Sequence, residues 1–126
     1  MTSVSSNTST WVSWIITCSC KPESFDQIST LANKMSEHFQ SNEPDTLNFE
    51  LSINSTHDEV HVHERYLNSA QALVHMKSFG DLFGSDFMSL LTPVKVVSYG
   101  FPTAELSSAL EGLSPIKMTA FQGFTR

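Results

Sequence analysis

Apolar and polar residues alternate along several stretches of the chain, and this two-residue period is typical of strands with one buried face. The stretch Thr46–Asn54 places its apolar residues on one side and its polar residues on the other. Glu59–Tyr66 alternates in the same way, and Ser55–Asp58 between them has turn composition. The two stretches are therefore predicted to form a β-hairpin.

The register of this hairpin is predicted to place Asn54 opposite Glu59. In this register, the residues of the apolar face pair with one another, and so do the residues of the polar face. On the apolar face, this register pairs Leu51 with Val62, Phe49 with Glu64 and Leu47 with Tyr66. On the polar face, it pairs Ser52 with His61, Glu50 with His63 and Asn48 with Arg65.

A strand and a helix are predicted before the hairpin. Trp11–Cys18 is rich in aromatic and β-branched residues, which favour a strand. Ser24 then begins a helix, with Gln27 at the capping-box position. The apolar residues of this helix recur at helical spacing and form its buried stripe: Ile28, Leu31, Ala32, Met35 and Phe39. The turn-forming residues 42–45 end it.

After the hairpin, Asn68 and Gln71 form a capping-box-like start to a second helix. Its stripe contains Ala72, Leu73, Met76 and Phe79, and Gly80 is expected to interrupt it. A further helical piece turns its apolar residues inward: Phe83, Phe87, Leu90 and Leu91. Pro93 precedes a fourth strand, Val94–Tyr99. Thr103 then caps a short helix that ends at Gly112, and Pro115–Phe121 is strand-like.

This order of elements predicts an α+β fold in which helices cover one face of a single antiparallel sheet. We expect three parts: a tail (1–10), a main domain (11–100) and a C-terminal helix–strand extension (101–126). A small sheet with an uncovered second face favours a partner, so we expect a homodimer with sheets packed face to face. The C-terminal strand is a candidate for pairing across that interface.

Composition narrows the class of protein. The chain has 126 residues, 40% of them hydrophobic and 16% charged, which is typical of one globular domain. A net charge of -6, without a basic stripe, argues against nucleic acid as a partner. No apolar run approaches the roughly 20 residues that a membrane span needs, and residues 1–10 lack the features of a signal peptide. Cys18 and Cys20 are expected to be free thiols in a reducing, cytoplasmic location.

The residue that points most directly to a site is Glu64. It shares the Val60 and Val62 face of its strand, where an ionisable group costs free energy unless it is paired or neutral. His75 lies at the edge of the next helix stripe and can hydrogen-bond Glu64 or take a proton itself. The alternative is a purely structural pair that ties helix to sheet.

A second candidate cluster lies on the opposite face of the hairpin. His61, His63 and Glu50 share that face, and two histidines with a carboxylate can hold a divalent metal. A polar face exposed to solvent or lining the dimer interior, with Glu50 and His63 as a cross-strand pair, is the favoured explanation, because two histidines at this spacing are a weak signal without further ligands. We expect no metal site here. The chain also has no Gly-rich phosphate loop and no nucleophile turn.

Several of these segments resemble the antibiotic biosynthesis monooxygenase family. The resemblance is carried by Glu43–Leu47, Glu64–Tyr66, Ser69–Ala70, His75 and Pro93, and it covers roughly Trp11 to Tyr99. It implies a ferredoxin-like antiparallel sheet with helices on one face, and a dimeric α/β barrel. The tail 101–126 resembles that of a subgroup described as quinol monooxygenases. Asp45 stands where the family has Gly, and His75 stands where its haem-degrading branch has Trp.

The resemblance implies a cofactor-independent monooxygenase that oxidises a small quinol or phenolic aromatic substrate with O2, with no cofactor. It implies a pocket between sheet and helices, with Glu64, His75 and Tyr66 as the catalytic residues. Six apolar residues are expected to contact the substrate: Trp14, Phe49, Leu51, Val62, Phe79 and Phe83. The alternatives are a non-oxidative isomerase or cyclase on the same scaffold, and a non-catalytic dimer that binds an apolar ligand.

Overall fold

Residues 9–125 are described by the computed structural model of this chain. The elements, in chain order, are β1 (Val12–Ser19), η1 (Pro22–Ser24), α1 (Phe25–Asn42), β2 (Thr46–Ile53), β3 (Glu59–Tyr66), α2 (Ser69–Leu82), α3 (Gly84–Leu90), β4 (Thr92–Gly100), α4 (Ala104–Leu110), η2 (Glu111–Leu113) and β5 (Ile116–Met118). This is the predicted α+β fold.

The strands form one open, mixed sheet in the order β2-β3-β1-β4-β5. The pairings among the first four strands are antiparallel, as predicted. The last strand is shorter than predicted and pairs in parallel with β4 of the same chain. The reason is the helical crossover: α4 carries the chain back along the sheet, so β5 runs in the direction of β4. The sheet is not a closed barrel.

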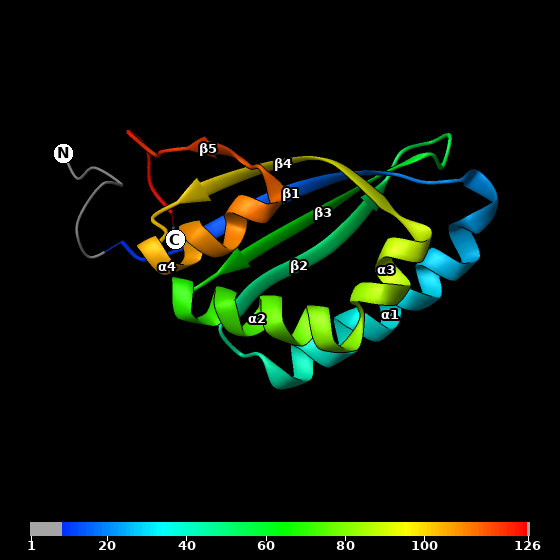
Figure 1. Ribbon diagram of the computed structural model, residues 1–126, viewed down its shortest axis with the longest axis horizontal. Helices are drawn as coiled ribbons and strands as arrows, with labels where there is room; N and C mark the ends of the chain where they lie inside the picture. Colours follow the sequence, from blue (N-terminus) through cyan, green and yellow to red (C-terminus); the bar gives the residue numbers. More distant parts are fainter. Residues whose placement is uncertain (1–8, 126) are drawn as a thin grey trace.

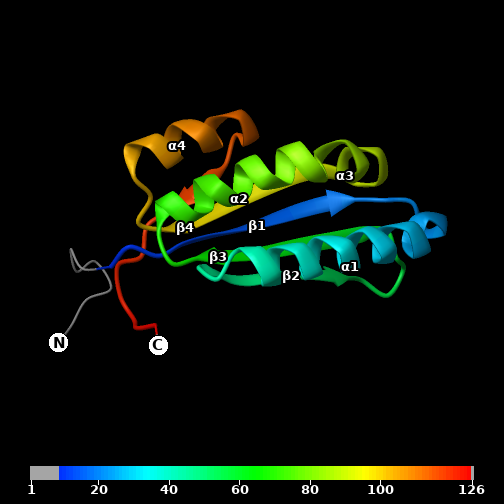
Figure 2. The ribbon, with the colours of Figure 1, turned by 90° about the horizontal axis from the view of Figure 1, so that it is seen from below.

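The helices pack against one face of this sheet (Figures 1 and 2). The core between the two layers has two parts. One joins β1 and β3 to α1 and α3, around Met35 and Val62. The other joins β1, β3 and β4 to α2 and α4, around Trp14 and Leu106. Glu64, His75 and Glu43 are buried in the same layer as these apolar residues, which is where a site between sheet and helices must lie.

The predicted hairpin register is confirmed except at its open end. Phe49 lies opposite Glu64, and the pairs from residue 48 to residue 53 are as expected. The pairing of Leu47 with Tyr66 is wrong, because a β-bulge between Thr46 and Asn48 places Thr46 opposite Tyr66 instead. Leu47 is consequently half exposed, whereas Thr46 is drawn toward the site.

Two helix boundaries differ from the prediction. Ser24 makes no capping hydrogen bond, because Pro22 starts a 3-10 turn that leads directly into α1. Asn68 does cap α2, since its side chain accepts from the backbone N–H of Gln71 at 2.9 Å. Gly80 does not interrupt α2, which continues to Leu82, because one glycine weakens a helix by only about 1 kcal/mol.

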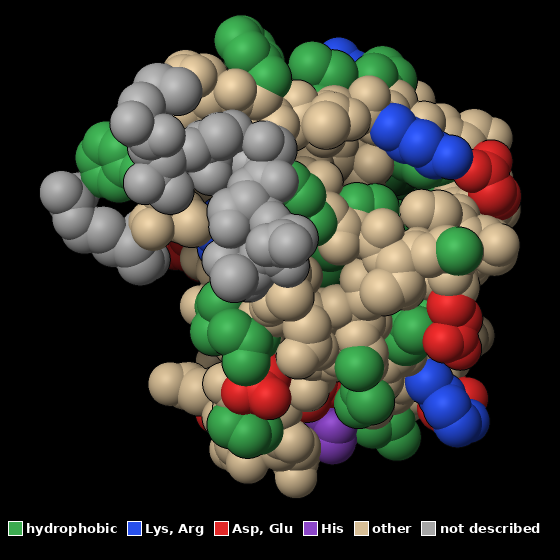
Figure 3. All heavy atoms as spheres, turned by 90° about the vertical axis from the view of Figure 1, so that its left-hand side faces the viewer, with side chains coloured by type: hydrophobic (Ala, Val, Ile, Leu, Met, Phe, Trp, Pro, Cys, Tyr) green, Lys and Arg blue, Asp and Glu red, His purple; other side chains and the backbone are tan. Residues whose placement is uncertain are grey.

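The predicted tail, residues 1–10, lies largely outside the described residues; within it, Thr10 donates a hydrogen bond to the carbonyl oxygen of Leu67. Figure 3 shows the end of the molecule near α4, where the visible Lys and Arg side chains are separated from one another and form no continuous patch. Within residues 9–125, no helix combines the length and the apolar character needed to cross a membrane.

Candidate functional site

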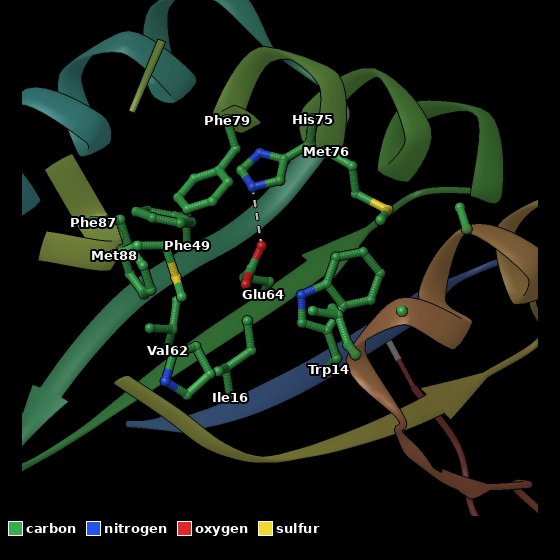
Figure 4. Close-up of a pocket in the computed structure, with 14 residues that line it drawn as sticks. Trp14, Ile16, Phe49, Val62, Glu64, His75, Met76, Phe79, Phe87 and Met88 are labelled. Atoms are coloured by element: carbon green, nitrogen blue, oxygen red, sulfur yellow. Dashed lines mark ion pairs between the residues drawn. The ribbon is translucent and has the colours of Figure 1, made fainter. Parts of the chain in front are cut away.

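Glu64 lies on the helix-facing side of the sheet, between two aromatic residues. The strand register places Trp14 of β1 opposite it on one side and Phe49 of β2 opposite it on the other. Its side chain is 5% exposed. Figure 4 shows the carboxylate in a pocket walled by these rings, directed toward His75. The predicted face of Glu64 is therefore correct, and its burial requires a compensating partner.

That partner is His75, one of the buried residues of α2. Its Nε2 atom lies 3.0 Å from Oε1 of Glu64. The same Glu64 oxygen accepts a hydrogen bond from the hydroxyl of Tyr66 at 2.5 Å. Tyr66 is fully buried, and its ring packs 5.1 Å from the His75 ring. The other carboxylate oxygen of Glu64, Oε2, has no hydrogen-bond partner among the described residues and remains available to a ligand.

A second carboxylate contacts the other side of the imidazole. Oε1 of Glu43 lies 2.9 Å from Nδ1 of His75, and both side chains are 3% exposed. Pro44 explains the position of Glu43: a residue before proline is disfavoured in helical conformation, so α1 ends and Glu43 becomes its C-cap. The hydroxyl of Thr46 also donates to Glu43 Oε1, at 2.8 Å, and Gln71 donates to Thr46. The bulge at Thr46 thus supports the site.

These contacts shift the pKa values of Tyr66 and His75. Burial raises the pKa of Tyr66 well above its usual value, and the adjacent Glu64 raises it further, so Tyr66 remains a neutral hydrogen-bond donor. For His75, burial alone lowers the pKa, but the hydrogen bonds and charges of Glu64 and Glu43 outweigh it, and the net shift is upward. This upward shift favours the charged form of His75, the form in which both ring nitrogens can donate hydrogen bonds.

The network borders an apolar cavity of about 350 Å³. Its wall comes from the sheet, from α2 and α3, and from the C-terminal extension: Trp14, Ile16, Phe49, Val62, Glu64, His75, Met76, Phe79, Phe87, Met88, Pro93, Ala109, Gly112 and Leu113. Exposed apolar side chains mark its opening, namely Met88 of α3 at 59% and Leu113 of η2 at 40%. The extension therefore closes part of the pocket of its own chain.

The predicted site residues divide into three groups. Glu64 and His75 line the cavity, and Tyr66 lies beneath it, bonded to Glu64. Of the predicted substrate contacts, four are in the cavity wall: Trp14, Phe49, Val62 and Phe79. The remaining two, Leu51 and Phe83, pack against the core cluster around Met35 and are not in the wall. In Figure 4, Trp14 lies across the pocket from Phe79 and Phe49.

Glu43 is the ionisable residue of the network that the sequence did not predict. Its side chain takes part in the network, whereas the turn composition and the family resemblance, which both include Glu43, did not predict this contact. A signal was present: Glu43 follows Phe39 by four residues and so continues the buried stripe of α1. An acidic residue on an apolar stripe is the same kind of signal that identified Glu64.

The second candidate cluster, His61, His63 and Glu50, does not form a comparable network. His61 lies 2.8 Å from the exposed Glu59 carboxylate, and Glu50 accepts from Asn48. Glu50 and His63 are opposite each other in the register. Across residues 9–125, no three His, Cys, Asp or Glu side chains are grouped so as to hold a metal ion. Cys18 and Cys20 are free thiols, and burial raises the pKa of Cys18 to about 12.

Structural comparison places this architecture among solved proteins. MupZ from Pseudomonas fluorescens matches with a TM-score of 0.82 at 20% identity, over 93% of this chain and 95% of that one. A protein of unknown function from Bacteroides thetaiotaomicron, described as a possible oxidoreductase, matches with a TM-score of 0.63 at 14% identity, over 73% of this chain and 98% of that one. A putative antibiotic biosynthesis monooxygenase from Nitrosomonas europaea matches with a TM-score of 0.60 at 13% identity, over 76% and 92%.

These likenesses confirm the fold that the resemblance implied: the chain has the ferredoxin-like α+β architecture of structures described as antibiotic biosynthesis monooxygenases. At these identities the comparison establishes the fold alone. No family model matches the sequence, and a search of curated proteins also found no match.

Proposed function

We propose that this chain is a cofactor-independent monooxygenase that oxidises a small quinol or phenolic aromatic molecule with O2. The observation that supports this most directly is the position of Glu64. Its carboxylate stands in an apolar cavity between aromatic rings, with Oε2 unpaired among the described residues and Oε1 held by His75 and Tyr66. A base that faces an apolar pocket is the main requirement for activating a quinol without a cofactor.

The proposed reaction uses the electrons of the substrate itself. Glu64 accepts the hydroxyl proton, and the resulting electron-rich anion reduces O2 and forms a carbon–oxygen bond. When the O–O bond breaks, a proton from the site allows the second oxygen atom to leave as water. For a quinol, the sum is quinol plus O2 giving hydroxyquinone plus water, a four-electron oxidation that needs no external reductant. The apolar wall keeps bulk water away from the anion.

The shape and lining of the cavity are suited to a flat substrate. Trp14 and Phe49 flank Glu64 on the neighbouring strands, and Phe79 closes the helix side. Aromatic faces at these positions favour a ring stacked between sheet and helix. A volume of about 350 Å³ is suited to a molecule of one or two rings. We propose Trp14, Phe49, Val62 and Phe79 as substrate contacts and Tyr66 as a residue that holds Glu64 in place.

Oxygen consumption with a panel of quinols and phenols tests this proposal. Glu64→Gln removes the base and keeps the shape, so we expect turnover to fall by about 100-fold or more. Glu59→Gln is the matched control, since Glu59 is exposed on the same strand and pairs with His61. Unchanged turnover in Glu64→Gln would remove Glu64 as the base. No oxygen uptake with any compound of the panel would reject the oxygenase itself.

A non-oxidative isomerase or cyclase is the second candidate. The observation that favours it is the close pairing of two proton-transfer groups: Nε2 of His75 and Oε1 of Glu64 lie 3.0 Å apart beside the same cavity. Such a pair can move a proton between two positions of a substrate without oxygen. Anaerobic exchange of deuterium into a bound ketone would support this reaction, whereas ligand-induced thermal shifts without exchange or turnover would favour an apolar-ligand-binding protein.

We also propose that the chain acts as a homodimer whose sheets pack face to face, forming a dimeric α/β barrel. The helices leave one face of the sheet uncovered, and that face mixes half-buried apolar and polar side chains, among them Ile15, Val97 and His63. A monomer by light scattering at micromolar concentration would refute this. The two free thiols are consistent with the cytoplasmic location that we propose.

A further inference from the structure

The buried network contains a residue that does not contact the cavity. Glu43 is 3% exposed and is absent from the cavity wall, yet its Oε1 atom lies 2.9 Å from Nδ1 of His75. Its backbone is fixed at both ends, because its N–H donates to Phe39 and its carbonyl accepts from Thr46. The Thr46 hydroxyl fixes the carboxylate itself. Glu43 is therefore held against the far side of His75.

The charge of Glu43 has one compensating partner. Oε1 accepts both hydrogen bonds, from Thr46 and from His75, while Oε2 is buried and has no partner among the described residues. A buried carboxylate with one bare oxygen is costly unless a cation lies beside it. Of the titratable side chains in the described part of the chain, His75 is the one in contact with Glu43 that can carry positive charge.

Burial opposes a positive charge on His75, but the charged groups around the ring are all acidic and favour it. The titratable groups that face the ring are Glu43 from the end of α1, and Glu64 and Tyr66 from β3. The other neighbours are the aromatic rings of Phe39, Phe49 and Phe79, from α1, β2 and α2. Both ring nitrogens thus point at carboxylate oxygens, an arrangement that only the doubly protonated ring satisfies with two donated hydrogen bonds.

We propose that Glu43 is a positioning residue that fixes the ring of His75 with both nitrogens protonated, so that His75 is the acid of the site and Glu64 the base. The double protonation of His75 is a property of the resting protein, whereas the assignment of acid and base rests on the proposed function. In the proposed reaction, Glu64 Oε2 accepts the substrate proton, and the Nε2 proton of His75 reaches the departing oxygen through Glu64.

The ionisation of His75 can be measured without any substrate. In nitrogen-15 NMR of the unmodified protein, both ring nitrogens of His75 should carry protons at pH 7.5. Glu43→Gln keeps an oxygen acceptor but removes the charge, so the titration midpoint of His75 should fall by about one pH unit or more. Glu37→Gln is the matched control, since Glu37 is exposed on the same helix and its replacement removes an equal charge. It should leave the midpoint unchanged.

Two results would overturn the proposal: a single protonated ring nitrogen in the unmodified protein at pH 7.5, or a Glu43→Gln midpoint no lower than that of Glu37→Gln. The first result would overturn the proposal even if Glu43→Gln fails to fold, because it needs only the unmodified protein. With an active substrate, the high-pH limb of turnover should move down in Glu43→Gln together with the NMR midpoint, and an unmoved limb would reject His75 as the acid. A panel without oxygen uptake rejects the oxygenase but leaves the NMR result as it stands.

Discussion

Replacing His75 with leucine tests whether the buried network stabilises the fold. The side chains of Glu43, His75 and Glu64 are only 3%, 3% and 5% exposed, and His75 contacts both carboxylates. Without the imidazole, two carboxylates remain buried without a cation between them. Removing one partner of a buried ion pair costs about 3–5 kcal/mol. For a chain of 126 residues, this corresponds to a fall in melting temperature of roughly 10–20 °C.

Urea denaturation followed by circular dichroism measures this free energy directly. His61→Leu is the matched control, because His61 also pairs with a glutamate but is 41% exposed, and such pairs contribute less than about 1 kcal/mol. The triple replacement Glu43→Met, Glu64→Met and His75→Leu removes every charge, so it should regain most of the lost stability. A His75→Leu variant as stable as His61→Leu, or a triple variant less stable than His75→Leu alone, would refute the reasoning.

Three further predictions follow from the same geometry. Folding raises the pKa of His75, so protonation of this residue stabilises the folded protein. This stabilisation is complete below the ordinary pKa of 6.5 and is lost as the pH rises through the higher pKa of the folded protein. The free energy of unfolding should therefore decline with rising pH in that window. A flat pH profile of stability, measured by urea denaturation, would contradict this. Tyr66→Phe removes the hydroxyl that donates to Glu64 at 2.5 Å and should cost about 1.5–3 kcal/mol in the same assay, and a neutral effect would show that the bond contributes little. Gly112 lines the cavity with open space beside it, so Gly112→Leu should weaken binding of an apolar fluorescent dye by roughly tenfold, whereas Gly80→Leu, away from the cavity, should not. Equal dye affinity in the two variants would place the bound dye elsewhere.

The sequence predicted the part of the site that depends on strand alternation. Glu64 could be placed because every second residue of β3 shares a face, and its apolar neighbours Val60 and Val62 identify that face as the buried one. The position of His75 was less certain, since it lies at the edge of its stripe, and only the packing of α2 against the sheet brings its Nε2 atom to 3.0 Å from Oε1 of Glu64.

Glu43 could not be placed with the same certainty because it is the C-cap residue that follows the last turn of a helix. Helical periodicity puts it below Phe39, but Pro44 ends the helix there, and the direction of a side chain at a helix end depends on the turn that follows. Leu51 and Phe83 illustrate the converse. Both are on inward-facing positions, as predicted, but a pattern of apolar residues does not distinguish core contacts from the wall of a cavity.

The C-terminal region shows a different limit of prediction from the sequence. Residues 101–126 were predicted as a helix and a strand-like segment, and both exist, but periodicity carries no information about which neighbour a short strand joins. The crossover through α4 decides it, because Leu106 and Leu110 pack into the core beside α2 and bring η2 to the opening of the cavity. Three residue pairs with β4 then complete the sheet.

The bulge in β2 has a consequence for how copies of this chain meet. β2 is an edge strand, and an edge with regular, unpaired N–H and C=O groups is a template for another strand. Between Thr46 and Asn48 that regular row is interrupted, with Leu47 turned outward. A strand of a second molecule cannot pair with this edge along its whole length, so the bulge disfavours filament growth through strand pairing at β2.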